Sequence, residues 1–504
     1  MVFIPQQDTL SGRRHGPGRA NGLWLRCTFS PTRVFQSAAV LFAAAAMAVA
    51  QTGTTSIPDA PAPSFPGAQS PFAGSVASEP VPGVVRISLQ DAIDRGLKQN
   101  LGVLLSNADI RSARGQRWEQ LSALLPHATA GPAINVSQIN LAELGFTNAS
   151  GLNLPPSIGP FSYFDARVNV TQSLFDWKSI SNTRAAGQNL KSSEYTYKDA
   201  RDVVVLAVGF SYLQAIADEA RVETAAAQVE TAKAVYSQAS DQVKAGTSAE
   251  IDGLRAKVEM QTRQQQLIQA RNDFAIQKLA VARVIGLAPG QEFELTDKTL
   301  YQSLEVPGVD ESLQRAYTAR SDYQAAMAEV RAAEFSRRAA LAGYFPSLSF
   351  NADYGTGGSH PSTATQVFDV RGTLAIPIFQ GGSVHGDVLQ ADAKLVESRE
   401  RLANLRGQID SDVRTALLNL QSSAELVEVA RSNIELAETA LTQSRDRFSA
   451  GVTDTVEVVQ SQQTVASAHE QYISSLYNYN YAKISLARSL GAAEAGIKEY
   501  FKGK

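Results

Sequence analysis

The second half of this chain repeats the first half. Residues 245–248 read AGTS and return as AGVT at 450–453, and residues 282–286 read ARVIG and return as ARSLG at 487–491. Both pairs are separated by about 205 residues. A repeat at one constant shift predicts a single architecture built from two similar halves.

Each half contains large residues spaced seven apart, with a small residue three positions after most of them. A sustained period of seven predicts coiled-coil packing, because the 3.6 period of an ordinary helix drifts off one face within a few turns. A generic coiled coil is therefore the first alternative to any more specific interpretation. The large residues are Val222, Val229, Tyr236, Val243, Leu420, Val427, Ile434, Leu441 and Phe448, and the small residues are Ala225, Ala232, Ala239, Gly246, Ser423, Ala430, Ala437 and Ser444.

Long helices are also favoured by the absence of proline from 161–288 and 378–504. From about Lys178 to Ala245 the pattern stays helical, which corresponds to a rod of about 100 Å at 1.5 Å per residue. We expect this helix to turn near Gly246 and a second helix to return to Gly286. The second half is predicted to turn near Gly451 and to return to Gly491.

A shorter helix precedes the strands in each half. Ser88 can cap the first one, with Asp91 completing a capping box, and we expect it to run to Leu125 with interruptions at Gly96 and Gly102. Pro126 ends this helix. In the second half Ser312 begins the equivalent helix and Pro346 ends it.

After each of these prolines the period changes from helical to two, which predicts two strands in each half. Each strand is close to the roughly 10 residues that a tilted strand needs to cross a bilayer. Seven aromatic residues are predicted at the strand ends, where membrane interfaces favour them. We expect Val168, Leu348, Phe350 and Leu374 to face lipid and Asn169, Asn351 and Arg371 to face a lumen. The aromatic residues are Phe161, Tyr163, Phe175, Trp177, Tyr344, Phe345 and Phe379.

The alternative for these strands is a small sheet on a soluble core with one wet face. If they lie in lipid instead, four strands cannot close a barrel, and an open sheet edge is not tolerated there. Several protomers must then contribute strands to one shared wall.

The N-terminal region reads as a targeting segment. Basic residues followed by an apolar run ending in A-V-A at 48–50 predict a secretory signal peptide over 1–50, and the Pro/Ala-rich stretch 51–83 predicts a flexible linker. The single cysteine, Cys27, lies in the predicted signal, so no disulfide is expected in the mature chain. The predicted order is then a first repeat at 84–290, a connecting segment at 291–311, a second repeat at 312–491 and a tail at 492–504.

The layout from about residue 85 to residue 491 resembles the TolC-like outer membrane factor family of Gram-negative bacteria. The resemblance rests on the duplicated order helix, strand, strand, helix, helix, on the two prolines and on the paired hairpin tips. It implies that Pro126 and Pro346 are helix-to-strand swivels. It implies a mainly α fold with membrane β-strands: a homotrimer whose three sets of four strands form one barrel, continuous with a periplasmic helical tunnel. It also implies an outer membrane exit duct that works with a periplasmic adaptor and an inner-membrane pump of the RND, ABC or MFS type.

The hairpin tips carry the candidate site. Asp252 and Glu457 follow the turn glycines Gly246 and Gly451 by six residues, and a ring of such acids around an axis would favour cations. The family has an acidic ring at the position matching Glu457, and it often has a second acid where this chain has Gln460, which implies a weaker ring here. The alternative is that both acids are solvated residues stabilised by the helix dipole. Phe448, three residues before Gly451, cannot hydrogen-bond, so packing is expected to contribute to holding the tip shut.

We find no enzymatic pattern in the sequence, since the five histidines are scattered and no nucleotide-binding or nucleophile motif is present. No cofactor or metal is expected, and the formal charge of −3 does not favour nucleic-acid binding. The favoured function is a passive channel from the periplasm to the exterior for efflux or type I secretion. A periplasmic adaptor protein and a structural coiled coil are the alternatives, and the transported substrate cannot be read from the sequence.

Overall fold

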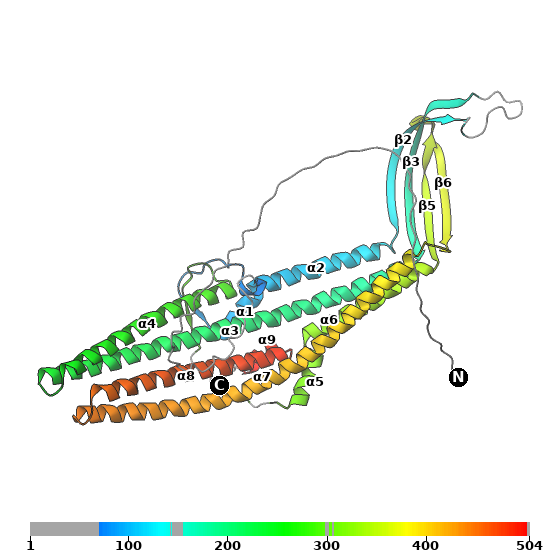
Figure 1. The fold of residues 1–504 in the computed structure, drawn as a ribbon. Coiled ribbons are helices and arrows are strands. Elements are labelled where there is room, and N and C mark those ends of the chain that lie inside the picture. The colour runs from blue at the N-terminus through cyan, green and yellow to red at the C-terminus, as the bar shows by residue number, and fades with distance from the viewer. Residues whose placement is uncertain (1–69, 142, 144–154, 298–301, 305–306, 501–504) are drawn as a thin grey trace, which may run out of the picture. The chain divides into compact units, whose positions relative to one another are not determined.

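The computed structural model describes residues 70–141, 143, 155–297, 302–304 and 307–500. The predicted signal peptide and residues 51–69 of the predicted linker lie outside these ranges. Figure 1 shows the duplicated order of elements. The first copy contains α1 (Leu89–Gln99), α2 (Leu101–Ser122), β2 (His127–Asn140), β3 (Ser157–Phe175), α3 (Trp177–Lys244) and α4 (Glu250–Ile285). The second copy contains α5 (Val309–Ala319), α6 (Ser321–Leu341), β5 (Ser347–Gly358), β6 (Thr365–Ala375), α7 (Ser383–Ser449) and α8 (Thr455–Ser489).

Short elements lie between, around and, for η2 and η3, inside the two copies. They are β1 (Val85–Ile87), β4 (Phe293–Leu295), α9 (Ala493–Tyr500) and the single-turn helices η1 (Pro71–Ala73), η2 (Ala342–Tyr344) and η3 (Pro361–Thr363).

The predicted capping box at Ser88 is confirmed. The Ser88 hydroxyl accepts the Asp91 N–H at 3.2 Å, and the Asp91 carboxylate accepts the Ser88 N–H at 3.2 Å. The predicted interruptions at Gly96 and Gly102 are wrong, because the helix breaks at Asn100, whose side chain caps α2 by accepting the Gly102 N–H. The second copy breaks at Arg320 and begins at Val309, three residues before the predicted start.

The predicted helix reversals lie at the expected glycines. Gly246 and Gly451 have φ values of +73° and +71°, a region that favours glycine. The Gly246 N–H donates to Val243 O at 3.0 Å, and the Gly451 N–H donates to Phe448 O at 3.0 Å. Each turn therefore satisfies the last carbonyls of its long helix in the same way.

The heptad prediction is confirmed most clearly in α7. Leu420 is fully buried and Val427 is 1% exposed, and the small residues between the large ones are buried as well. In α3 the small residues Ala232 and Ala239 are buried together with Val235, and the predicted Tyr236 is partly buried against the same core. The helices pack as two antiparallel hairpins, α3 with α4 and α7 with α8, which are joined by contact between α3 and α8.

A second core surrounds the middle of α3. Tyr212 is fully buried, and its hydroxyl donates to the Ile87 carbonyl at 2.9 Å. Strand β1 pairs in parallel with β4, which brings Phe293 into this core, and α9 adds Ile497. The described parts of 291–311 and 492–504 therefore pack at least partly against the middle of the long helices. Among the described helices α3 alone is long and apolar enough to span a membrane, and its most apolar window is 61% buried in the protein.

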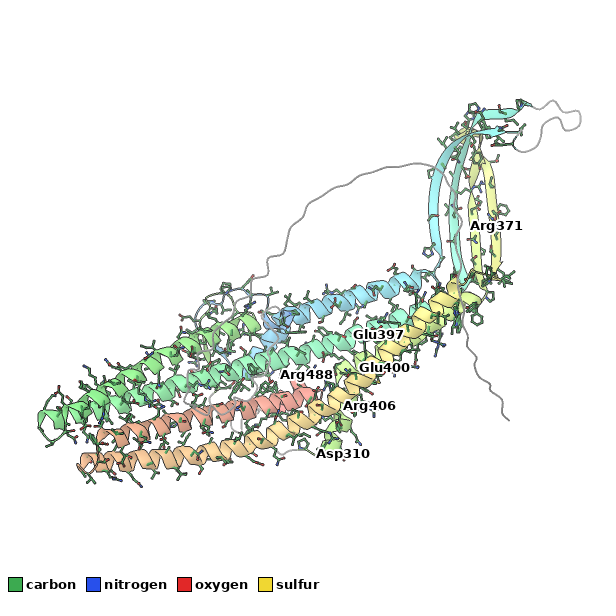
Figure 2. The ribbon with its side chains drawn as sticks, in the orientation of Figure 1. Asp310, Arg371, Glu397, Glu400, Arg406 and Arg488 are labelled. Carbon is green, nitrogen blue, oxygen red and sulfur yellow. The ribbon has the colours of Figure 1, made fainter. Side chains whose placement is uncertain are left out.

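A buried carboxyl lies beside this core and gives the fold a pH dependence. Asp202 on α3 is 9% exposed, and it faces Arg488 of α8, Asp199 of its own helix and a backbone N–H at Glu494 of α9. Burial raises the pKa of Asp202 to about 6, against the partial compensation from Arg488. Figure 2 labels Arg488, which also contacts Asp199 at 2.5 Å.

Acidification is therefore expected to stabilise the protein between pH 7.5 and pH 5. The folded state binds the Asp202 proton more tightly than the unfolded state does, so stability from this group rises as the pH falls through 6. Burial also raises the pKa values of Asp199 and Asp218, which act in the same direction. Thermal unfolding followed by circular dichroism should show a higher midpoint at the lower pH and a smaller gain in Asp202→Asn. An equal gain in the variant would contradict this assignment.

Candidate functional site

The four long strands form one antiparallel sheet in the order β2-β3-β5-β6. Leu348 pairs with Leu374, and Val168 pairs with Tyr354. Because side chains alternate along a strand, this register places Val168, Leu348, Phe350 and Leu374 on one face. That face is exposed in the protomer, where Val168 is 46% and Leu374 is 61% exposed. Within the described residues, this apolar surface has no partner.

The opposite face carries polar and charged side chains. The Arg167 guanidinium donates to Asp165 at 2.7 Å and to Asp353 at 3.1 Å. Asn169 pairs with Asp353, and Asn351 pairs with Arg371 on β6, which Figure 2 labels. The register thus places the three residues predicted for the lumen together, on the face opposite the four predicted for lipid.

In the described parts of the chain, no strand lies beside either edge of this sheet. Strand β2 pairs only with β3, and β6 pairs only with β5. Their outer backbone N–H and C=O groups are open to another chain, and within lipid each unsatisfied group would cost several kcal/mol. The sheet is therefore incomplete as a membrane structure within one protomer.

Exposed apolar residues surround one end of the sheet, where strands and helices meet. Five of the predicted interface aromatics lie there. Tyr163 lies inside β3, which begins at Ser157 and not near Tyr163 as predicted, and its hydroxyl accepts from Arg167 at 3.2 Å on the polar face. Phe161 lies further along the same strand, paired with Ser137. Pro126 and Pro346, which the resemblance predicts to be swivels, directly precede β2 and β5 at this end. The exposed residues are Leu125, Phe175, Trp177, Tyr344, Phe345, Ile376, Ile378 and Phe379.

At the hairpin tips the two acids are held in matching ways. The Ser248 hydroxyl donates to Asp252 at 3.0 Å, and the Thr453 hydroxyl donates to Glu457. Arg447 at the end of α7 lies 3.5 Å from the Glu457 carboxylate. Both acids lie in the first turn of their helix, where the helix dipole also stabilises a negative charge.

The other predicted tip residues divide between surface and core. Gln460 is exposed, as are the turn glycines Gly246 and Gly451. Phe448 is only 4% exposed and packs among residues of all four long helices, including Val235, Ala256 and Val458. The structure therefore places Phe448 inside the protomer, where it holds the two hairpins together.

A buried arginine also joins the two hairpins, and sequence reasoning missed it. Arg263 on α4 is 3% exposed, pairs with Glu259 at 2.7 Å and donates to the Gln463 side chain of α8 at 2.7 Å. The residue at the equivalent position of the second copy is Ala468. The repeat predicts an apolar residue at position 263, because its equivalent is Ala468. The charged residue at that position was the only sequence signal for a buried arginine.

Sequence reasoning also missed two apolar seams on the outer long helices. On α4, Ile268 is 68% and Leu279 is 69% exposed, and on α7, Leu418 is 67% exposed. The residues 205 positions away are Ile473, Ile484 and Leu213, which are 8%, 0% and 4% exposed. Residues that are buried in one copy are thus exposed in the other. A comparison of each residue with the residue 205 positions away could have revealed these seams.

Within the described residues no three His, Cys, Asp or Glu side chains are grouped so as to hold a metal ion. The sheet presents an apolar face and a polar face, and the hairpin tips present acids at the turns.

This arrangement of sheet and helices is similar to that of known proteins. A family model described as outer membrane efflux protein matches residues 92–287 and 312–492. The chain is 23% identical over 335 residues to the pyoverdine export outer membrane protein OpmQ of Pseudomonas putida, covering 65% of this chain and 70% of that protein. It is 23% identical over 420 residues to the outer membrane protein TolC of Escherichia coli K12, covering 77% of this chain and 80% of that protein.

Solved structures show the same fold. The outer membrane protein VceC of Vibrio cholerae aligns with a TM-score of 0.71 at 17% identity, covering 80% of this chain and 96% of that chain.

Proposed function

The chain belongs to the outer membrane efflux protein family, and on that premise we propose that it is the outer membrane exit duct of a tripartite efflux or type I secretion system. It conducts substrates passively from the periplasm to the exterior of a Gram-negative cell. A periplasmic adaptor and an inner-membrane pump of the RND, ABC or MFS type supply docking and energy. The protein carries out no covalent chemistry of its own.

The observation that carries this proposal is the two-faced, edge-open sheet joined to long helical hairpins. An apolar face suits lipid and a polar face suits a water-filled lumen. Val168, Leu348, Phe350 and Leu374 would then contact lipid, while Asn169, Asn351 and Arg371 would line the pore. The function of an adaptor protein or of a structural coiled coil does not explain such a sheet. We find no observation that favours either of these two functions.

The internal repeat also indicates how protomers assemble. Inside one protomer α3 packs against α8, burying Leu213 and Ile473. If α7 packs against α4 of the next protomer in the same way, Leu418 and Ile268 become the equivalent buried pair. A head-to-tail contact of this kind closes into a ring when the rotation allows. We propose a homotrimer, in which β6 of one protomer pairs with β2 of the next and completes a barrel.

Single-channel recording in a planar bilayer tests the duct. Purified protein should insert and give discrete conductance steps without any energy source, because the path is an open aqueous lumen. Protein that remains in the aqueous phase and never conducts would contradict the proposal.

The same recordings test the acids at the tip. We propose that Glu457 contributes to a carboxylate ring and Asp252 to a weaker one, so Glu457→Ala should lower cation preference. It should also weaken block by a multivalent cation by about 1 kcal/mol, or roughly fivefold. Asp252→Ala should give a smaller change of the same sign.

Glu435→Ala removes an exposed acid from α7 far from the tip and serves as the control. It should leave selectivity and block unchanged. If Glu457→Ala and Asp252→Ala behave like this control, the two acids serve only to stabilise the first turns of their helices.

A further inference from the structure

Two adjoining cavities lie in a groove between α2, α3 and α6. Their volumes are about 410 Å³ and about 420 Å³, and they share Gln188, Lys191 and Glu194 of α3. Each volume lies within the range typical of sites for small organic ligands. The groove is distant in sequence from the hairpin tips and is formed by the helices next to the sheet.

Five of the six charged side chains that line this groove are basic. Arg184, Lys191 and Lys198 are spaced seven apart on α3, about 10 Å from one to the next along the helix. Arg117 of α2 and Arg331 of α6 join them. Glu194 is the single acid among the residues that line the two cavities. The groove therefore concentrates positive charge from three helices.

Two other basic residues of α3 are ion-paired. Arg201 pairs with Glu494 at 2.7 Å, and Arg221 pairs with Asp218 at 2.7 Å. Within the described part of the chain, no ion pair links Lys191, Arg117 or Arg331 to a carboxylate. The groove thus offers positive charge that the protein itself leaves uncompensated.

The floor of the groove is apolar. Leu190 and Phe335 line one cavity, and Ile110 and Met327 line the other. The Oε1 atom of Gln188, which borders both cavities, is buried and has no hydrogen-bond partner in the described structure. Buried acceptors normally receive a hydrogen bond from a donor. A ligand that carries a hydroxyl or amide N–H group would supply one.

The internal repeat shows that the fold does not require these cations. The positions 205 residues after Arg184, Lys191 and Lys198 are Leu389, Val396 and Ala403. The second copy therefore builds the same helix with three apolar residues in the same register. The basic stripe is a feature of the first copy alone.

We propose that this groove binds an amphiphilic organic anion, with the apolar body on the floor and a carboxylate, sulfate or phosphate group among the cations. Charge-assisted hydrogen bonds from lysine and arginine are the strong polar contacts available to such a group. A conducting channel does not need this site, so the inference goes beyond the proposed duct.

Energy transfer from tryptophan to a dansyl-labelled fatty acid tests the proposal. Trp118 adjoins Arg117, so it reports a dansyl group bound in the groove of the full-length protein in uncharged detergent. Dansylaminoundecanoate should give saturable transfer, and Lys191→Val/Lys198→Ala should weaken its binding about tenfold. These substitutions copy the second repeat and should leave folding intact. Lys233→Val on the same helix, exposed and outside the groove, is the matched control.

Competition identifies the source of the anion. If dodecanoate displaces the dansyl probe and phosphatidylglycerol does not, the natural ligand is a small anion in transit. If phosphatidylglycerol displaces the probe as well, the ligand is a lipid headgroup. Both results support the site. Equal displacement by the cation dodecyltrimethylammonium would overturn the proposal. So would unchanged binding in the double variant.

Discussion

Ile268→Asp/Leu279→Asp should convert the assembled protein into monomers. Both side chains are more than two-thirds exposed in the protomer, and both correspond to residues buried against α3 in the second copy. Burying one such side chain is worth about 1.5 to 3 kcal/mol, and each protomer contact loses two. A carboxylate at the same place adds a desolvation cost. Light scattering in mild detergent should report the mass of one chain with unchanged helical content.

Thr262→Asp provides the control for this experiment. Thr262 is exposed on the same helix, and its equivalent in the second copy, Ser467, is exposed too. This variant should keep the full assembly. A stable oligomer in the double seam variant would show that α4 does not form the contact between protomers, whatever the state of the sheet.

Val170→Arg should strongly destabilise the membrane-inserted state. Val170 shares the apolar face with Val168, and it pairs with Ala352, the sixth of the 12 residues of β5. This position is close to the bilayer midplane if β5 spans it, where arginine on the lipid face costs about 2 to 4 kcal/mol. Denaturant titration of protein folded in vesicles measures the difference. Phe350→Arg, nearer the strand end, should cost less.

The neighbouring residue on the same strand gives the control. Thr171 pairs with His127 and Asn351 on the polar face, so Thr171→Arg should alter conductance and leave stability nearly unchanged. Asn351 is less suitable, because an arginine there would lie opposite Arg371. Equal losses in Val170→Arg and Thr171→Arg would refute the assignment of the two faces.

Much of this fold could be predicted because local patterns decide it. The turn glycines Gly246 and Gly451 are determined by backbone conformation, and the heptads of α7 by their spacing. The break at Asn100 was missed because glycine is tolerated inside a packed helix, while an asparagine side chain can cap a new one. Local sequence patterns thus predicted the helices and turns better than the residues at which a helix is interrupted.

The site could be predicted only in part, because its residues depend on contacts between distant segments. The strand faces followed from alternation, but Tyr163 was assigned to a membrane interface from its residue type and its predicted place at a strand end. Its bonds to Arg167 and Asp165 could not be inferred without the register. The burial of Phe448 and Arg263 likewise depends on how the two hairpins pack, which no single helix encodes.

The division of buried surface between helices and sheet determines the order of events in the cell. The fully buried side chains, such as Tyr212 and Leu420, belong to the helical part and are satisfied within one chain in water. The long strands contribute no buried residue among those described. A newly exported chain can therefore complete its helices before it meets a membrane or another copy. We expect closure of the strands to wait for both, so that biogenesis ends with a concerted insertion whose rate depends on protomer concentration.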